Sequence, residues 1–176
     1  MGGLLVLIGS ILALKPKRLL KTGGIVAAAA LLTGAGASEP GYPDGFRSWA
    51  HVHSGVVLEG SPAYERFGGL HEIYGNAIAM RDYPKGRYSN GSVFVFDVHN
   101  VAIAKGSIEP TSRRQVDVMI KQGGAWKFFE FKGDSRSERS VAAAQGEQEC
   151  AACHNKAPRD HVFHDPVQAP SMPQSN

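Results

Sequence analysis

The stretch Ser92-Val-Phe-Val-Phe-Asp-Val-His99 decides the fold of this 176-residue chain. Its β-branched and aromatic residues, which favour extended backbone, occupy both alternating faces. A strand with one face in solvent would instead carry polar residues at every second position. We therefore predict that Ser92 to His99 forms a central strand buried on both faces.

Further strand-like segments lie before and after this central strand. They are rich in apolar and β-branched residues and are separated by turn-forming residues. The predicted strands are His51 to Leu58, Leu70 to Tyr74, Arg114 to Lys121 and Ala125 to Lys132, with Val101 to Ala104 continuing the central strand or pairing with it. Gln122-Gly123-Gly124 is expected to be a three-residue hairpin loop, which favours antiparallel pairing.

Two helices are expected beside this sheet. Asn76 is a good N-cap for a short helix from Ala77 to Tyr83. Glu138 to Cys153 is rich in alanine, glutamate and glutamine, which favours a helix that carries or leads into the C-terminal cysteine motif. The chain after Ala157 contains four prolines and is expected to be irregular. The predicted class is α+β, a mainly antiparallel sheet with appended helices.

The first 37 residues have the order of a secretory signal peptide. A basic cluster precedes the apolar run Gly23 to Leu32, and Ala35-Gly36-Ala37 predicts cleavage after Ala37. The basic residues are Lys15, Lys17, Arg18 and Lys21. An earlier apolar run, Gly3 to Leu14, is interpreted as an over-long start, with a membrane tether as the alternative. We expect a signal peptide at 1–37, one domain at 38–176, and export to the periplasm.

The charge balance argues against nucleic acid as a partner. The chain has 19 basic and 16 acidic residues, and all four charges before Ser38 are basic. The expected mature chain is therefore close to neutral, and the basic isoelectric point belongs to the precursor. No basic stripe runs through the remaining sequence, so nucleic-acid binding is excluded.

The only two cysteines stand in the motif Cys150-Ala-Ala-Cys153-His154. A disulfide across two residues would close a very small loop and stabilise the fold little. This spacing, with histidine next, is the attachment motif of a single c-type haem, in which both thiols form thioether bonds and His154 binds the iron. The alternatives are a redox dithiol, which does not require the histidine, and half of a zinc site, which needs further ligands.

The ligand opposite His154 decides what such an iron can do. Methionine or histidine there gives a six-coordinate electron carrier, and an open position gives a gas binder or a catalyst. The candidates in the mature chain are Met80, Met119, Met172, His51, His53, His71, His99, His161 and His164. None stands out, and we interpret the position as open or weakly filled.

Beyond the motif, several segments together resemble the cytochrome P-460 family over nearly the whole mature chain. They are Tyr42 to Trp49, His71 to Asn76, Gly86 to Val93, Val118 to Lys121, Gly123 to Phe128 and the C-terminal haem motif. The resemblance implies a mainly antiparallel sheet, a five-coordinate haem with His154 as its ligand, and commonly a homodimer. The family includes hydroxylamine-oxidising members and gas-binding cytochromes c′-beta.

Two positions bear on which of these activities the resemblance implies. Oxidising members have a lysine cross-linked to the haem, and the corresponding position here is Phe96, with no lysine between Lys85 and Lys105. Oxidising members also carry a carboxylate that handles protons, and Asp117 falls near that position, with Glu130 as a weaker candidate. The alternatives are core packing for Phe96 and a solvent-facing strand position for Asp117.

Three hypotheses follow. The leading one is a periplasmic protein of the cytochrome c′-beta type that binds NO or CO at a five-coordinate iron, with a role in scavenging or sensing nitrogen oxides. The second is a haem oxidoreductase that acts on hydroxylamine or peroxide, with Asp117 as its proton-handling residue. The third is a six-coordinate electron carrier, which requires a redox partner protein.

Overall fold

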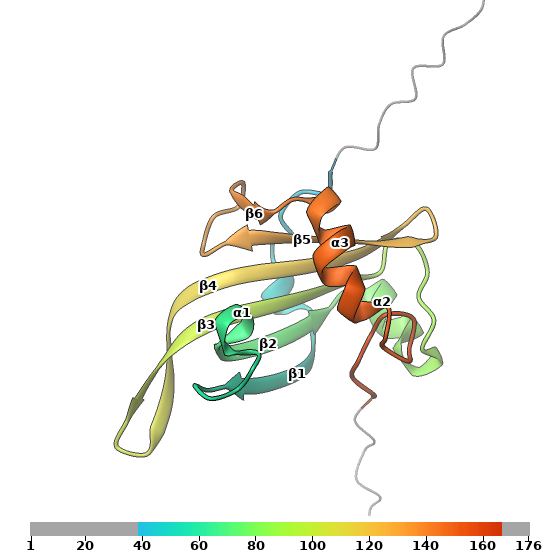
Figure 1. Ribbon diagram of the computed structural model, residues 1–176. Helices are drawn as coiled ribbons and strands as arrows, with labels where there is room; N and C mark the ends of the chain where they lie inside the picture. The colour runs from blue at the N-terminus through green and yellow to red at the C-terminus, as the bar shows by residue number, and fades with distance from the viewer. Residues whose placement is uncertain (1–38, 167–176) are drawn as a thin grey trace, which may run out of the picture. The chain divides into compact units, whose positions relative to one another are not determined.

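A computed structural model describes residues 39–166, which form a six-stranded antiparallel sheet. The strands lie in sequence order, each paired with the next along the chain (Figure 1). Their bounds are β1 Ala50–Val57, β2 Gly69–Gly75, β3 Val93–Ala104, β4 Ser107–Gln122, β5 Ala125–Lys132 and β6 Arg139–Val141. The helices are η1 Phe46–Ser48, α1 Tyr64–Phe67, α2 Ala77–Asp82, η2 Tyr83–Lys85 and α3 Ala143–His154. This confirms the predicted α+β class.

The strand predicted to be central, β3, lies between β2 and β4, and its first half, residues 93–98, is buried on both faces. One face, here called the α3 face, carries Phe94 and packs against α2 and the α3 region. The other, the η1 face, carries Val93 and Val95 and packs against Phe46 of η1. Each face has its own apolar core, as the sequence of β3 predicts.

The hairpin of β3 and β4 extends well beyond the rest of the sheet as a two-stranded arm (Figure 1). It turns at Lys105 and Gly106, both of which have positive φ, as a two-residue hairpin turn requires. β4 begins at Ser107, whereas the sequence predicted that it begins at Arg114, so the predicted strand was too short. The extra residues are mostly polar and include Pro110, so their composition carried no strand signal.

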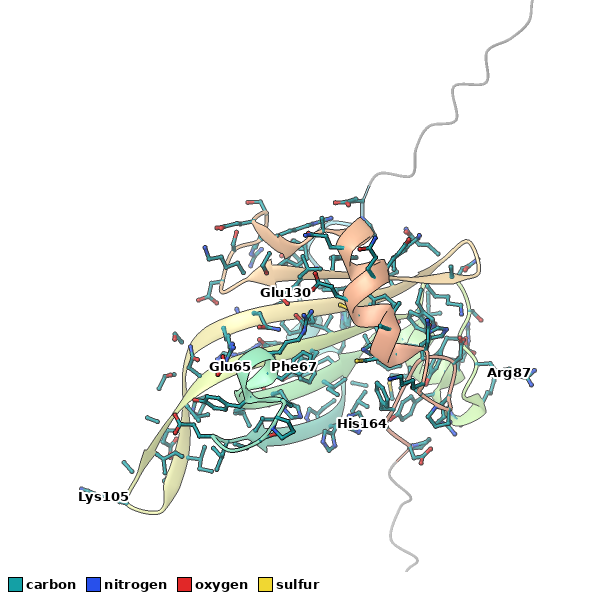
Figure 2. The ribbon with its side chains drawn as sticks, viewed as in Figure 1. Glu65, Phe67, Arg87, Lys105, Glu130 and His164 are labelled. Carbon is teal, nitrogen blue, oxygen red and sulfur yellow. The ribbon has the colours of Figure 1, made fainter. Side chains whose placement is uncertain are left out.

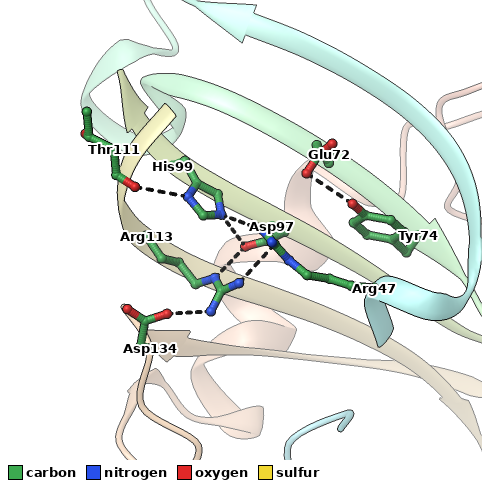
Figure 3. A network of polar contacts seen from close by, with 8 residues as sticks. All are labelled: Arg47, Glu72, Tyr74, Asp97, His99, Thr111, Arg113 and Asp134. Atoms are coloured by element: carbon green, nitrogen blue, oxygen red, sulfur yellow. Dashed lines mark hydrogen bonds and ion pairs between the residues drawn. The ribbon is translucent and has the colours of Figure 1, made fainter. Parts of the chain in front are cut away.

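A buried carboxylate ties the η1 face together. Asp97 on β3 is fully buried, and Arg47 Nη2 and Arg113 Nε each lie 2.7 Å from one of its oxygens (Figure 3). His99 Nε2 lies 3.3 Å from the same carboxylate, and Arg113 also pairs with Asp134. Burial alone would raise the pKa of Asp97, but hydrogen bonds from the two guanidinium groups outweigh burial and lower it. The ionised carboxylate therefore links η1, β3 and β4.

The last helix, α3, lies across the α3 face and packs on β5 (Figure 1). Gly146 permits the close approach, since a Cβ at this position would lie 2.0 Å from the Phe128 carbonyl oxygen. The helix was predicted to begin at Glu138, which is wrong, because Arg139–Val141 adds a short sixth strand to the edge of β5. Asn76 caps α2 as predicted, its side chain accepting a hydrogen bond from the Ala79 amide at 2.9 Å.

The predicted signal peptide and Met172 lie outside the described residues. Among residues 39–166, no helix is long and apolar enough to cross a bilayer.

Candidate functional site

A cavity of about 350 Å³ lies between α3 and the α3 face of the sheet. Its walls come from the sheet, from α1, from α3 and from the chain that follows α3. Phe67 of α1, Glu130 of β5 and His164 beyond α3 are seen around this site in Figure 2. The lining is mostly apolar and aromatic, as in typical cofactor pockets.

Strand register builds the sheet wall of the cavity as two cross-strand rows. Directly paired residues point to the same face of a sheet. Row one consists of Phe94, Met119 and Phe128. Row two consists of Ile73, Phe96, Asp117 and Glu130, all in the cavity lining, and His53 of β1 extends the row beyond that lining. Row one is entirely apolar, whereas row two changes from aromatic to acidic as it crosses the sheet.

The opposite wall carries the cysteine motif at the C-terminal end of α3. Cys150, Cys153 and His154 all line the cavity, and both thiols are free. The thiols are three residues apart and so lie on one side of the helix. Burial raises the pKa of the Cys150 thiol, and nearby Arg66 opposes that shift. Arg66 Nη2 lies 3.7 Å from the Cys150 sulfur.

The His154 ring is fixed in one orientation. Its Nδ1 lies 2.7 Å from the His161 carbonyl oxygen and donates a hydrogen bond to it. Phe128 and Phe163 pack against the ring, with centroid distances of 4.9 and 5.3 Å. Burial lowers the pKa of His154, which favours the neutral imidazole. With Nδ1 protonated, the Nε2 lone pair is available to bind a metal.

Asp117 and Glu130 form a carboxyl pair in row two. Gln115 Nε2 donates to the Asp117 oxygens at 3.0 and 3.1 Å and to Glu130 at 3.3 Å. Ser140 donates a further hydrogen bond to Glu130. Burial and the adjacent Glu130 charge raise the pKa of Asp117 well above its ordinary value. Asp117 thus lies in the cavity wall and not on a solvent-facing edge.

Phe96 also lies in the cavity wall, next to Asp117 in the register. Its ring contacts Phe67 edge-on at 5.7 Å and stacks on His71 at 4.8 Å. It therefore packs against other aromatic rings and lines the cavity at the same time. The sequence left open whether Phe96 belongs to the wall of the haem site or to the packed core, and this position is compatible with both roles.

The histidines and methionines considered as iron ligands are widely distributed. His53 stacks on His164 at 4.1 Å and lies 5.9 Å from His71. Burial lowers the pKa of both His71 and His164, and His53 lowers them further. Of the described candidates, Met119 and His164 line the cavity, and those outside its lining are Met80, His51, His53, His71, His99 and His161. In residues 39–166, no group of three His, Cys, Asp or Glu side chains is arranged to bind a metal ion by itself.

Several residues of the site were not identified from the sequence. Phe128 and Phe163 enclose the His154 ring, and Gln115 bridges the carboxyl pair. Phe128 had a detectable signal, because strand alternation places it opposite Phe129, on the same face as Glu130. His161 acts through its backbone carbonyl, for which the sequence carries no signal.

The residues present fit a haem. Two free thiols, a neutral imidazole with an available nitrogen and an aromatic wall together meet the needs of a macrocycle held by thioether bonds and one axial ligand. A model of the family described as Cytochrome P460 matches residues 43–164. No curated protein matches the chain.

Proposed function

Since the chain belongs to the cytochrome P460 family and is a haem protein, we propose that it is an exported c-type monohaem protein that binds a small neutral gas. The observation that carries this proposal is the cavity in which Cys150, Cys153 and His154 face a wall containing Phe96. In the hydroxylamine-oxidising relatives, a cross-linking lysine is expected at the position of Phe96. The N-terminal pattern that ends at Ala37 supports export.

The motif residues would hold the cofactor. The two cysteine thiols would form thioether bonds, and His154 would supply the axial nitrogen, already oriented by its bond to the His161 carbonyl. A bound haem supplies an iron with a position at which a neutral diatomic such as NO or CO can bind. Phe128 and Phe163 pack on the imidazole ring and limit its contact with water.

An open position opposite His154 is supported by the packing of Met119 and His164, the two candidates for a sixth ligand that line the cavity within residues 39–166. Met119 lies between Phe94 and Phe128 in row one, and Phe128 itself contacts the His154 ring. His164 follows Phe163, which contacts the same ring, and stacks on His53. Both side chains are therefore engaged in packing near His154.

The apolar part of row two favours neutral ligands. Phe96, Ile73 and the nearby Phe67 offer no hydrogen bonds, so water and charged ligands entering there lose solvation without compensation. Asp117 can hydrogen-bond a ligand at the acidic end of the row, but its raised pKa favours the neutral carboxylic acid, which attracts a cation less than a carboxylate does. A neutral diatomic molecule loses little solvation free energy on entering such a cavity.

An absorption spectrum tests the proposal. The full chain is produced in a host that attaches haem, and the ferrous spectrum is recorded before and after addition of NO or CO. We expect the Soret band to shift with either gas. An unchanged band would refute gas binding, and a low-spin six-coordinate spectrum in both oxidation states would favour the electron carrier.

Variants of the motif test the mode of attachment. Cys150→Ser with Cys153→Ser should leave no haem on the chain after denaturing electrophoresis. His51→Gln, an exposed histidine outside the cavity lining, should leave attachment unchanged and serves as the control. Covalent haem retained by the double variant would contradict attachment through these thiols.

The carboxyl pair favours a second function, a haem oxidoreductase acting on hydroxylamine or peroxide. Asp117 lies in the wall, and burial beside Glu130 raises its pKa, which favours the protonated form that can give up a proton. Turnover of hydroxylamine with an artificial electron acceptor, lost in Asp117→Asn and kept in the exposed Glu109→Gln, would support it. Absence of turnover in the unaltered protein would exclude it for that substrate.

A further inference from the structure

The chain after α3 makes a strained turn beside His154. Asp160 and His161 have φ values of 47° and 71°, and the Val162 amide donates to the Arg159 carbonyl at 3.2 Å. Two consecutive residues with positive φ define a turn that normally contains glycine or asparagine. Non-glycine residues persist in such conformations only where the surroundings hold them.

Asp160 provides the contacts that hold this turn. Lys121 Nζ lies 2.9 and 3.1 Å from its two carboxylate oxygens, and Trp126 Nε1 donates at 3.2 Å. The backbone amide of Tyr88 donates to the same carboxylate at 3.1 Å. Burial opposes ionisation of Asp160, but the hydrogen bonds from Lys121, Tyr88 and Trp126 outweigh it and lower the pKa. The turn is thereby fixed to β4, β5 and the loop before β3.

The same turn supplies the acceptor for the His154 ring. The carbonyl oxygen of His161, one residue after Asp160, accepts a hydrogen bond from His154 Nδ1 at 2.7 Å. Rotation of the turn would move this carbonyl away from the ring. We propose that Asp160 is a positioning residue that, through the turn, fixes the tautomer and orientation of His154. This inference rests on the proposed function, in which His154 is the axial ligand.

A physical effect on the cofactor follows. A hydrogen bond from Nδ1 to a carbonyl makes the other imidazole nitrogen a stronger donor, which favours the oxidised metal. Loss of the bond should therefore favour reduction. Changes in such supporting contacts commonly alter metal affinity by about 10–100-fold, and we expect the lower end here.

The experiment compares Asp160→Ala and Asp160→Asn with Asp165→Ala in the haem-loaded full chain. Asp165 lies on the same segment, is exposed and pairs with Arg159, so it is a matched control. For Asp160→Ala we expect about a tenfold gain in the equilibrium constant for reduction, or about 59 mV for one electron. The iron–histidine stretching frequency of the ferrous protein should fall in Asp160→Ala and fall less in Asp160→Asn. The control should match the unaltered protein in both measurements.

Two further measurements keep the proposal open to refutation. If Asp160→Ala does not fold, Trp126→Phe removes one hydrogen-bond donor to Asp160 and keeps an aromatic ring. The reduction potential and the iron–histidine stretching frequency should then change in the same directions but by smaller amounts. Unaltered potential and stretching frequency in the folded variants would overturn the proposal. If the unaltered chain takes up no haem, the proposed function fails, and the ¹⁵N shifts of His154 in the full chain still report whether Asp160 fixes its tautomer.

Discussion

Replacing Gly146 by alanine should force α3 away from the sheet. The added Cβ would lie 2.0 Å from the Phe128 carbonyl oxygen and 2.6 Å from its carbonyl carbon. Because real contacts of this kind essentially never fall below 3.0 Å, helix and strand must separate by about 1 Å. The obstacle is backbone, which cannot rotate away as a flexible side chain can.

Two opposing contributions set the size of the effect. Overpacking of this kind costs about 1–3 kcal/mol, and a clash with backbone belongs at the upper end. Alanine in place of glycine favours the helix by about 1 kcal/mol. We expect a net loss of about 2 kcal/mol in the free energy of unfolding. The thiol of Cys150 lies one turn further along α3, so attachment of haem should also become less complete.

Urea titration followed by tryptophan fluorescence measures the loss, and the haem content per chain measures the displacement. Gly41→Ala is the matched control, because a Cβ there meets no atom within 4 Å and φ is not in the left-handed region. If Gly146→Ala proved about 1 kcal/mol more stable than the unaltered protein, helix propensity alone would be acting. The close approach of α3 to β5 would then be wrong.

Three further predictions concern pH and backbone strain. Because the pKa of Asp117 is raised in the fold, its contribution is fully present below the unfolded value of about 3.9 and is lost as pH rises through the folded pKa. In urea titrations, Asp117→Asn should therefore gain stability relative to the unaltered protein from about pH 4 upward, by about 1.4 kcal/mol for each pH unit until the folded pKa is reached. Burial lowers the pKa of His71, so its neutral ring stabilises the fold above about pH 6.5 and this contribution is lost on acidification. His71→Gln should flatten the decline in stability below that pH, and an unchanged decline would contradict the assignment. Gly69→Ala should lower the free energy of unfolding by about 3 kcal/mol, since φ is +112° and a Cβ would lie 2.0 Å from the His99 carbonyl oxygen.

Local pattern was enough to predict the central strand, the α2 cap and the cysteine motif. Each depends on residues close together in the sequence, such as the alternation around Phe94 or the amide cap at Asn76. The short strand Arg139–Val141 lacked such a signal, because three residues, two of them polar, become a strand only through pairing with β5. The sequence could not show that it interrupts the predicted helix.

The composition of the cavity wall depends on pairing between distant segments. The irregularity between His51 and His53 in β1 brings His53 into register with Ile73, where it stacks on His164 of the cavity lining. The carbonyl of His161 reaches His154 only because Asp160 is bound by residues far along the chain. These are properties of tertiary register, which a pattern of residue types does not encode.

The buried carboxylate on the η1 face has a consequence for how the sheet aligns itself. Asp97 is the immediate neighbour of Phe96, so a slip of one residue in β3 would turn this carboxylate into the cavity and remove Phe96 from it. In that slipped alignment the acid would lose both arginine partners while staying out of water, a penalty of about 3–5 kcal/mol. The ion pairs of Asp97 with Arg47 and Arg113 therefore stabilise the observed register of β3 over registers shifted by one residue.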